Sequence, residues 1–165
     1  MNTSKINLDE ISYKILAILQ ENARISFTEI GKEINLTSSS VAERVKKLEE
    51  LGIIKKYTVQ LNEEKMGFSI TAIMLVSFAG VFTKQEKDIV DILSKYYQVI
   101  DCVRITGRND FLIKIIVQSM DEFKIINDEV AKFGQVETSL VVTNFTNNTT
   151  IDIKKMIDIS RSIGL

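Results

Sequence analysis

Two helix-forming segments separated by only three residues place the strongest constraint on how this chain can fold. The second segment, from about Ser38 to Leu51, has Val41, Val45 and Leu48 at the spacing of one buried helix face. The opposite face carries small hydroxyl groups in its first turn and charged side chains further along. The link Asn35-Leu36-Thr37 therefore joins a short helix to a longer helix with one apolar and one polar face.

The shorter segment has clear helix-start and helix-stop signals. Ser26 is a favourable N-cap residue, and Glu29 three residues later completes a capping box. The sequence predicts a helix over 27–34 that ends at the asparagine of the link, a residue type that tolerates the left-handed conformation. Thr37 or Ser38 then caps the longer helix.

A further helix is predicted upstream, over 8–22, from the helical spacing of its apolar residues. A short helix, a turn of three residues and a longer helix is the arrangement of a helix-turn-helix. A plain three-helix bundle with a polar outer face would have the same spacing. Three serines (38–40) followed by basic residues favour the helix-turn-helix, because a helix in the DNA major groove needs a slim end near the bases and cations near the phosphates.

The residues after the longer helix predict a β-strand. Gly52 is a suitable residue to end the helix, and 53–61 is rich in β-branched and aromatic residues. Lys55 and Lys56 on this strand either lie along the DNA backbone as a wing or protect an exposed strand edge. The polar segment 62–67 ends in glycine and is the expected domain boundary.

Beyond residue 67 the pattern changes to a βαββαβ order. Strands are predicted over 68–79, 99–106, 111–117 and 136–145, and helices over 84–97 and 121–133. One set of alternate residues in the first strand is entirely apolar and the other set is mixed, which indicates helices on one face of the sheet and another layer, such as a second subunit, on the other. The chain is therefore predicted to be α+β, with a winged helix-turn-helix followed by a ferredoxin-like domain.

A polar break over 144–150 precedes an amphipathic tail helix predicted over 151–163. This helix can pack on its own domain, pack on a partner subunit, or fray. We expect a winged helix-turn-helix domain at 1–62, a ferredoxin-like domain at 63–147 and a helical tail at 148–165.

The composition argues against catalysis. The 165-residue chain has no histidine and a single cysteine, Cys102, so it lacks the residues of most metal sites and most nucleophile–base pairs. We expect Cys102 to be a small buried core residue. There is no apolar run of about 18 residues and no apolar signal core, so we expect a cytoplasmic protein with no membrane contact. The sequence predicts no enzyme activity, no metal and no cofactor.

The charge distribution permits DNA binding but does not by itself indicate it. The formal net charge is −1. Residues 38–61 carry five Lys or Arg residues against three Glu residues. A bias this small predicts few phosphate contacts per subunit, which several subunits acting together would offset.

The complete pattern resembles the Lrp/AsnC family of prokaryotic transcriptional regulators over about residues 6–146. In the first domain the similarity is carried by LDEISYKILAILQENARISFTEIGKEINLTSSSVAERVKKLEELGIIKKYTVQLN, and in the second by GRNDF (107–111) and VETSLVV (136–142). The resemblance implies a sequence-specific regulator that binds double-stranded DNA. It also implies a homodimer that assembles to a tetramer or octamer, and a small-molecule effector that is usually a free amino acid.

The resemblance places the DNA-contacting positions on the recognition helix and the wing. These positions are Thr37, Ser38, Ser39, Ser40, Glu43, Arg44, Lys47 and Lys55. Arg44 flanks the buried stripe, so it can instead pair with an acid of the first helix such as Glu10 or Glu21. Glu43 can accept a hydrogen bond from cytosine or pair with Lys47.

The resemblance also places an effector site at the turn after the second strand and on the last strand. Its positions are Gly107, Arg108, Asn109, Asp110, Thr138, Ser139 and Leu140. Glycine lets backbone amides approach a carboxylate, and Asp110 can hold an ammonium group or orient the loop. By themselves the residues 107–110 predict only a tight hairpin turn.

Two other functions fit parts of this pattern. An architectural protein that wraps DNA with little sequence preference would use the same fold. An amino-acid sensor or enzyme built on the ferredoxin-like domain would need no DNA, although the missing histidine argues against the enzyme.

Overall fold

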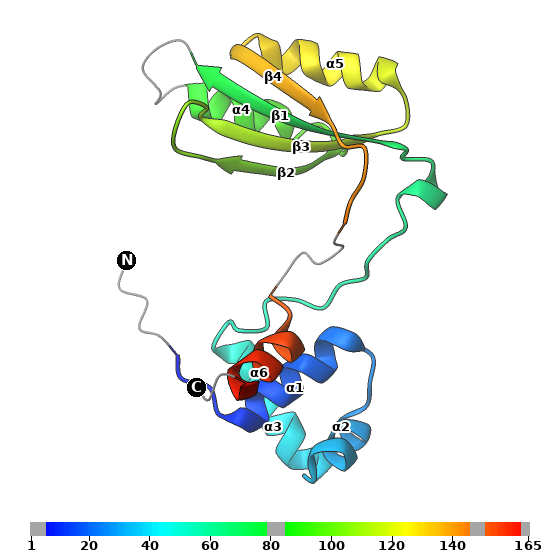
Figure 1. Ribbon diagram of the computed structural model, residues 1–165, viewed down its shortest axis with the longest axis vertical. Helices are drawn as coiled ribbons and strands as arrows, with labels where there is room; N and C mark the ends of the chain where they lie inside the picture. Colours follow the sequence, from blue (N-terminus) through cyan, green and yellow to red (C-terminus); the bar gives the residue numbers. More distant parts are fainter. Residues whose placement is uncertain (1–5, 79–84, 146–150, 163–165) are drawn as a thin grey trace. The chain divides into compact units, whose positions relative to one another are not determined.

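The computed structural model describes residues 6–78, 85–145 and 151–162, and these residues form two compact units. One unit combines residues 1–60 with residues 146–165, and the other spans residues 61–145. We call them the helical unit and the sheet unit, and Figure 1 shows the helices and strands of each.

The helical unit contains the three predicted helices: α1 (Glu10–Glu21), α2 (Phe27–Ile34) and α3 (Ser38–Glu50). The capping box at the start of α2 is confirmed, since the Ser26 side chain accepts from the Glu29 N–H and the Glu29 side chain accepts from the Ser26 N–H. Asn35 has φ of 58°, so the predicted left-handed end of α2 is also confirmed. Thr37, rather than Ser38, is the N-cap of α3.

Gly52 ends α3 with a positive φ of 68°, as the sequence predicts. The N–H of Gly52 donates to the carbonyl of Glu49, and the N–H of Ile53 donates to the carbonyl of Leu48. These two bonds form a Schellman motif, which satisfies carbonyl groups that the end of a helix would otherwise leave unpaired.

The core of the helical unit lies between α1, α2 and α3. Its buried side chains are Ile15, Leu16, Leu19, Ile30, Val41, Val45 and Leu48. A fourth helix, α6 (Ile153–Ser162), packs against α1, and Ile153 contacts this core. The tail helix is therefore part of the helical unit. Ile163, which the sequence pattern places on its apolar face, lies outside the described residues.

The strand predicted over 53–61 is wrong. No residue of this segment belongs to a strand, and residues 55–61 are exposed. A β-strand needs a neighbouring strand to bind its N–H and C=O groups, and none of the strands in the described part of this chain lies beside it. High β-propensity was therefore not sufficient, because propensity depends on a sheet being present.

The sheet unit has the predicted βαββαβ order: β1 (Ile70–Phe78), α4 (Gln85–Leu93), β2 (Val99–Arg104), β3 (Phe111–Val117), α5 (Met120–Ala131) and β4 (Gly134–Leu140). The strands lie in the order β2-β3-β1-β4, and every neighbouring pair is antiparallel. This is the ferredoxin-like arrangement.

Strand β4 begins and ends earlier than the predicted range 136–145. Gly134 is its first residue, and a Cβ atom there would lie 2.2 Å from the backbone oxygen of Ser77, so only glycine lets β4 start so close to β1. Its last bond to β1 runs from the N–H of Val141 to the carbonyl of Thr71. Thr71 is the second residue of β1, which starts at Ile70, so β1 offers at most one further pairing position beyond this bond.

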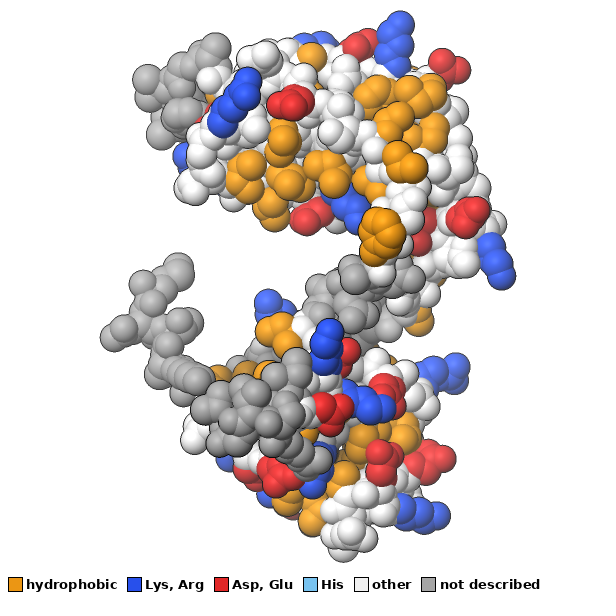
Figure 2. All heavy atoms as spheres, viewed as in Figure 1, with side chains coloured by type: hydrophobic (Ala, Val, Ile, Leu, Met, Phe, Trp, Pro, Cys, Tyr) orange, Lys and Arg blue, Asp and Glu red, His pale blue; other side chains and the backbone are white. Residues whose placement is uncertain are grey.

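The two faces of the sheet differ. One face carries the fully apolar parity of β1 and packs against Ile89 of α4 and against Ile126 and Val130 of α5. The other face carries the mixed parity, including Ile73 and Leu75, which are half-buried. Figure 2 shows apolar side chains exposed on the surface of this unit among charged ones. The predicted difference between the two parities of β1 is confirmed.

Candidate functional site: a DNA-binding helix and a ligand-binding loop

The first turn of α3 is organised by Thr37. Its hydroxyl accepts from the Ser40 N–H and donates to the Ser40 hydroxyl at 2.9 Å. The Ser39 hydroxyl lies 3.0 Å from the Thr37 hydroxyl oxygen. Thr37 and Ser40 thus support the start of the helix, while the side chains of Ser38 and Ser39 are exposed to solvent.

Charged residues extend this exposed surface along α3. Glu43 and Lys47 are both exposed, and they do not form an ion pair with each other or with another described residue. Lys46 differs, because its ammonium lies 3.7 Å from the carboxylate of Glu50. The structure therefore presents Ser39, Glu43 and Lys47 to solvent opposite the buried face of α3, and Ser38 is exposed in the first turn.

Arg44 connects α3 to the start of α1. Its Nη1 atom donates to Oδ2 of Asp9 at 2.7 Å, and Asp9 is also the N-cap of α1, accepting from the Ser12 N–H. The predicted pairing with a first-helix acid is thus present, with Asp9 in place of Glu10 or Glu21. The bond from Ser12 and the Arg44 guanidinium lower the pKa of Asp9 to about 2, so the carboxylate stays charged at neutral pH.

We expect Arg44 to act mainly through Asp9. Asp9→Ser removes the charge but keeps an oxygen that can cap α1, and Arg44→Ala removes the other partner. Both side chains are partly exposed, so a double-mutant cycle on unfolding free energy should give a coupling of only about 0.5 kcal/mol. If Arg44 acts only through Asp9, the two single variants should differ in DNA affinity only by the small effect of the opposite charges that they remove. A much larger loss of affinity for Arg44→Ala would assign Arg44 to the DNA contact.

Gly31 is a residue of the helix-turn-helix that the sequence reasoning missed. Its carbonyl accepts from the N–H groups of Asn35 and Leu36, which closes the turn between α2 and α3. A Cβ atom on Gly31 would lie 2.4 Å from the backbone oxygen of Leu36. A glycine inside a predicted helix, just before a tight turn, is the signal that identifies such a close approach.

The segment after α3 is held by Tyr57, whose hydroxyl donates to Oε1 of Glu49 at 2.8 Å. Partial burial and the neighbouring Glu49 carboxylate raise the pKa of Tyr57 to about 12, so the hydroxyl keeps its proton. This bond fixes the chain two residues beyond Lys55, whose side chain is exposed. Lys55 therefore lies two residues before a tyrosine that is hydrogen-bonded to α3, although no strand forms a wing here.

The loop 107–110 is anchored to the end of β1. Ser77 donates from its hydroxyl to Oδ1 of Asn109 at 2.7 Å and to the carbonyl of Arg108. The Phe78 N–H donates to Oδ2 of Asp110 at 2.9 Å, and the Asp110 N–H donates to the carbonyl of Val76. Gly107 has φ of 129°, which favours glycine. The loop is therefore a defined structure and not a simple two-residue turn.

The last strand places the other three predicted ligand residues beside the middle and the first half of β1, away from the loop at its end. Thr138 pairs with Met74, Ser139 with Ile73 and Leu140 with Ala72. The Ser77 and Ile73 positions are about 13 Å apart at the usual strand rise. Within one chain the structure does not bring the loop and these three residues together.

The three residues of β4 also point to different faces. The Thr138 hydroxyl lies 3.4 Å from Oδ1 of Asn127 on α5, so Thr138 faces the helices. Its neighbours Ser139 and Leu140 are exposed. Since neighbouring side chains on a strand alternate, Ser139 lies on the open face of the sheet.

A surface groove of about 550 Å³ lies between α4 and β2 in the sheet unit. Tyr96, Tyr97, Ile100, Cys102 and Phe111 contribute to its lining. Cys102 is only half-buried and not fully buried as predicted, and partial burial raises the pKa of its thiol, which disfavours a reactive thiolate. Across the described ranges, no group of three or more His, Cys, Asp or Glu side chains is arranged to hold a metal ion.

Comparisons with known proteins match each unit to a function. A winged helix-turn-helix DNA-binding family model matches residues 8–55, and the Lrp/AsnC ligand binding domain model matches residues 71–151. Over the parts of the chain that the structure describes, no helix is both long enough and apolar enough to cross a membrane.

Individual relatives agree with these models over nearly the whole chain. The transcriptional regulator AzlB of Bacillus subtilis is 32% identical over 155 residues, covering 92% of this chain and 99% of the relative. The structure of LrpC from B. subtilis has a TM-score of 0.79 at 25% identity and covers 87% of this chain and 100% of that one. The Neisseria meningitidis regulator NMB0573, solved as a complex with L-Met, has a TM-score of 0.81 at 25% identity and covers 91% and 99%. This chain belongs to the Lrp/AsnC family of transcriptional regulators, with a DNA-binding helix-turn-helix and a ligand-binding domain.

Proposed function

We propose that this protein binds a specific operator as a homodimer or a larger homo-oligomer in the cytoplasm, and that a free amino acid changes this binding. The observation that carries the proposal is the solvent-exposed surface of α3, where Ser39, Glu43 and Lys47 lie opposite the buried stripe and Ser38 is exposed in the first turn. Two such helices in a dimer would read successive major grooves about 34 Å apart. Thr37, Ser40, Arg44 and Lys55 support or flank this surface.

The sheet unit supports an effector site shared between copies of the chain. The loop 107–110 lies at the end of β1, whereas the residues 138–140 lie beside its middle and first half in one chain. An effector that contacts both groups therefore needs a second copy to supply one of them. The half-buried apolar residues on the open face of the sheet, such as Ile73 and Leu75, fit a surface that another copy covers.

An amino acid is the effector class that the loop chemistry favours. The Asp110 carboxylate supplies a negative charge for an ammonium group, and Gly107 leaves backbone groups open to a carboxylate. The bound L-Met in the related N. meningitidis structure supports the same class. The supporting relatives are named regulators and not enzymes, so we propose no catalytic role.

Thermal-shift measurements with each amino acid, combined with gel shifts on the promoter region of the protein's own gene, test the proposal. We expect one or a few amino acids to raise the melting temperature and to change the gel-shift affinity or the number of complexes. Equal affinity for the promoter and for random DNA at physiological salt would contradict a specific operator. A long footprint with regular hypersensitive sites would instead indicate an architectural protein that wraps DNA.

Lys47 should contact a DNA phosphate, whereas Lys46 should not. Lys47→Ala is expected to weaken binding to all sequences and to reduce the slope of log affinity against log salt by about 1. Lys46→Ala is the matched control, because the same charge is removed from a neighbouring residue that pairs with Glu50. Binding titrations at four salt concentrations measure both slopes. Equal slopes for Lys47→Ala and the wild type would remove Lys47 from the interface.

A further inference from the structure

Helix α6 belongs to the helical unit, although the chain reaches it only after passing through the whole sheet unit. Residues 146–165 fall in the same compact unit as residues 1–60, and residues 61–145 form the other unit. The chain therefore crosses between the units twice, once before β1 and once after β4. Both ends of the sheet unit are covalently connected to the unit that carries α3.

The start of α6 is fixed to the end of α1 by directional bonds. The side-chain amide of Gln20 makes two hydrogen bonds to the backbone at the start of α6. Its Nε2 donates to the carbonyl of Ile151 at 2.9 Å, and its Oε1 accepts from the Ile153 N–H at 3.1 Å. The Lys154 ammonium lies 2.7 Å from Oε1 of Glu21.

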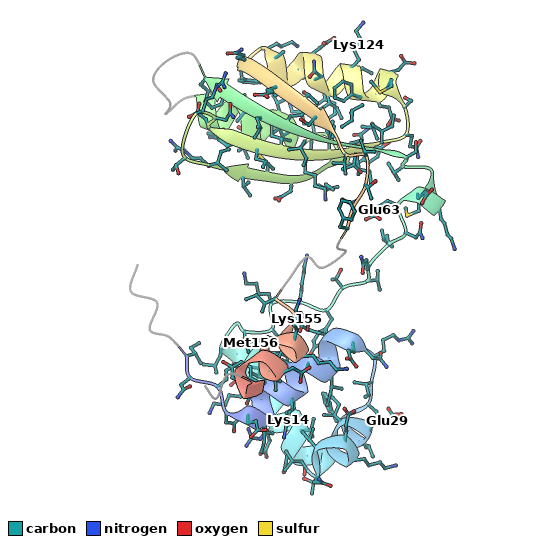
Figure 3. All side chains as sticks on the ribbon, in the orientation of Figure 1. Lys14, Glu29, Glu63, Lys124, Lys155 and Met156 are labelled. Carbon is teal, nitrogen blue, oxygen red and sulfur yellow. The ribbon has the colours of Figure 1, made fainter. Side chains whose placement is uncertain are left out.

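An apolar contact completes the docking of α6. Ile153 packs against the buried core of the helical unit, while the neighbouring Ile151 is exposed. Figure 3 labels Lys155 and Met156 on the same helix; Lys155 is exposed and Met156 is half-buried. The helix therefore presents one side to α1 and another to solvent.

The helix needs this docking in order to form. It has 10 residues, and isolated helices shorter than about 12–15 residues are marginal in water. The ion pair adds little, because exposed pairs stabilise weakly. The Ile153 contact and the two Gln20 hydrogen bonds, together with the half-buried Met156 and Ile157, therefore order α6 on this unit. Loss of these contacts should release the second connection while leaving the first intact.

We propose that α6 anchors a second tether on the DNA-binding unit, with Gln20 and Ile153 as its positioning residues, and that this tether favours simultaneous binding to two half-sites. The inference rests on the proposed function, because it requires two copies on one operator. A unit held by two connections samples fewer positions than a unit held by one. Fewer positions mean a higher effective concentration of the second recognition helix once the first is bound.

The test uses the full chain with Ile153→Asp and Lys154→Glu combined. We expect its affinity for a fragment with one half-site to equal that of the wild type. Its preference for a fragment with two half-sites over one should fall about tenfold. Hydrogen exchange at the α6 backbone amides measures docking directly and should become fast in this variant only.

The matched control is Ile151→Asp combined with Lys155→Glu, which makes the same two changes at exposed positions of the same segment. This control should keep both slow exchange in α6 and the preference for two half-sites. An undocked variant that keeps the full preference overturns the tether and leaves the proposed function standing. A wild-type protein without any preference for two half-sites overturns the dimeric binding that we propose, and the tether with it.

Discussion

A Gly31→Ala protein should have a less stable helical unit and should lose operator binding. Alanine normally stabilises a helix interior relative to glycine by about 1 kcal/mol. Here its Cβ atom would lie 2.4 Å from the carbonyl oxygen of Leu36, which is backbone and cannot rotate away. Overpacking of this kind costs about 1–3 kcal/mol, so we expect the clash to outweigh the gain in propensity. Thermal unfolding followed by circular dichroism measures the difference.

The effect on DNA binding should be larger than the effect on stability. The carbonyl that must move belongs to the turn residue immediately before Thr37, and Thr37 caps α3. A shift there moves the exposed serines of the first turn of α3 relative to the rest of the unit. We expect the affinity for the operator to fall at least about tenfold at a temperature where the variant is folded.

Gly52→Ala is the control for Gly31→Ala, because it makes the same change at the other end of α3. Gly52 has φ of 68°, and a Cβ atom there would meet no atom within 4 Å. Strain in the left-handed region should cost about 1 kcal/mol without moving the first turn of α3. Operator binding should be retained. If Gly31→Ala is more stable than the wild type and binds the operator normally, the turn does not need the close approach.

Local signals in the sequence predicted the helical unit well. The Ser26–Glu29 capping box and the left-handed Asn35 depend only on residues a few positions apart, so their effect does not require knowledge of the fold. The alternation in β1 was equally informative, because a strand with one buried face repeats every two residues. Local signals of this kind were sufficient to predict the order of helices and strands in both units.

The wrong and missed features depend on distant parts of the chain, except for the close approach of Gly31 to the nearby residue Leu36. Residues 53–61 have strand propensity but no neighbouring strand among those described, and β4 ends at Leu140, close to the start of its partner strand β1. The Arg44–Asp9 pair joins residues 35 positions apart, and the close approaches at Gly31 and Gly134 are to backbone atoms of other segments. A periodic pattern within one segment does not contain this information.

The predicted ligand residues illustrate the same limit. The turn residues 107–110 predicted a turn, and the structure adds that three hydrogen bonds join the side chains of this region to the backbone or to each other. The separation of this loop from Ser139 along β1 follows from the register of β4, which the sequence pattern did not provide.

Asp110→Asn should weaken effector binding about 10–100-fold while leaving effector-free DNA binding unchanged within about twofold. The amide keeps an oxygen that can accept from the Phe78 N–H, so the loop keeps its anchor. What is lost is the negative charge that we propose for the ammonium group of the effector. A hydrogen bond to a charged partner contributes about 1.5–3 kcal/mol, which corresponds to this range of affinity. Isothermal titration calorimetry with the amino acid found by the thermal-shift screen measures the change.

Asp110→Ala separates the two roles of this side chain, because it removes both the charge and the acceptor for the Phe78 N–H. It should abolish the effector response and, unlike Asp110→Asn, should also lower the melting temperature of the sheet unit by releasing the loop. Asp128→Asn on the exposed side of α5 controls for the change in net charge and should behave as the wild type. A normal response in Asp110→Asn with a lost response in Asp110→Ala would mean that Asp110 shapes the loop without touching the effector. A normal response in both would place the effector site elsewhere in the sheet unit.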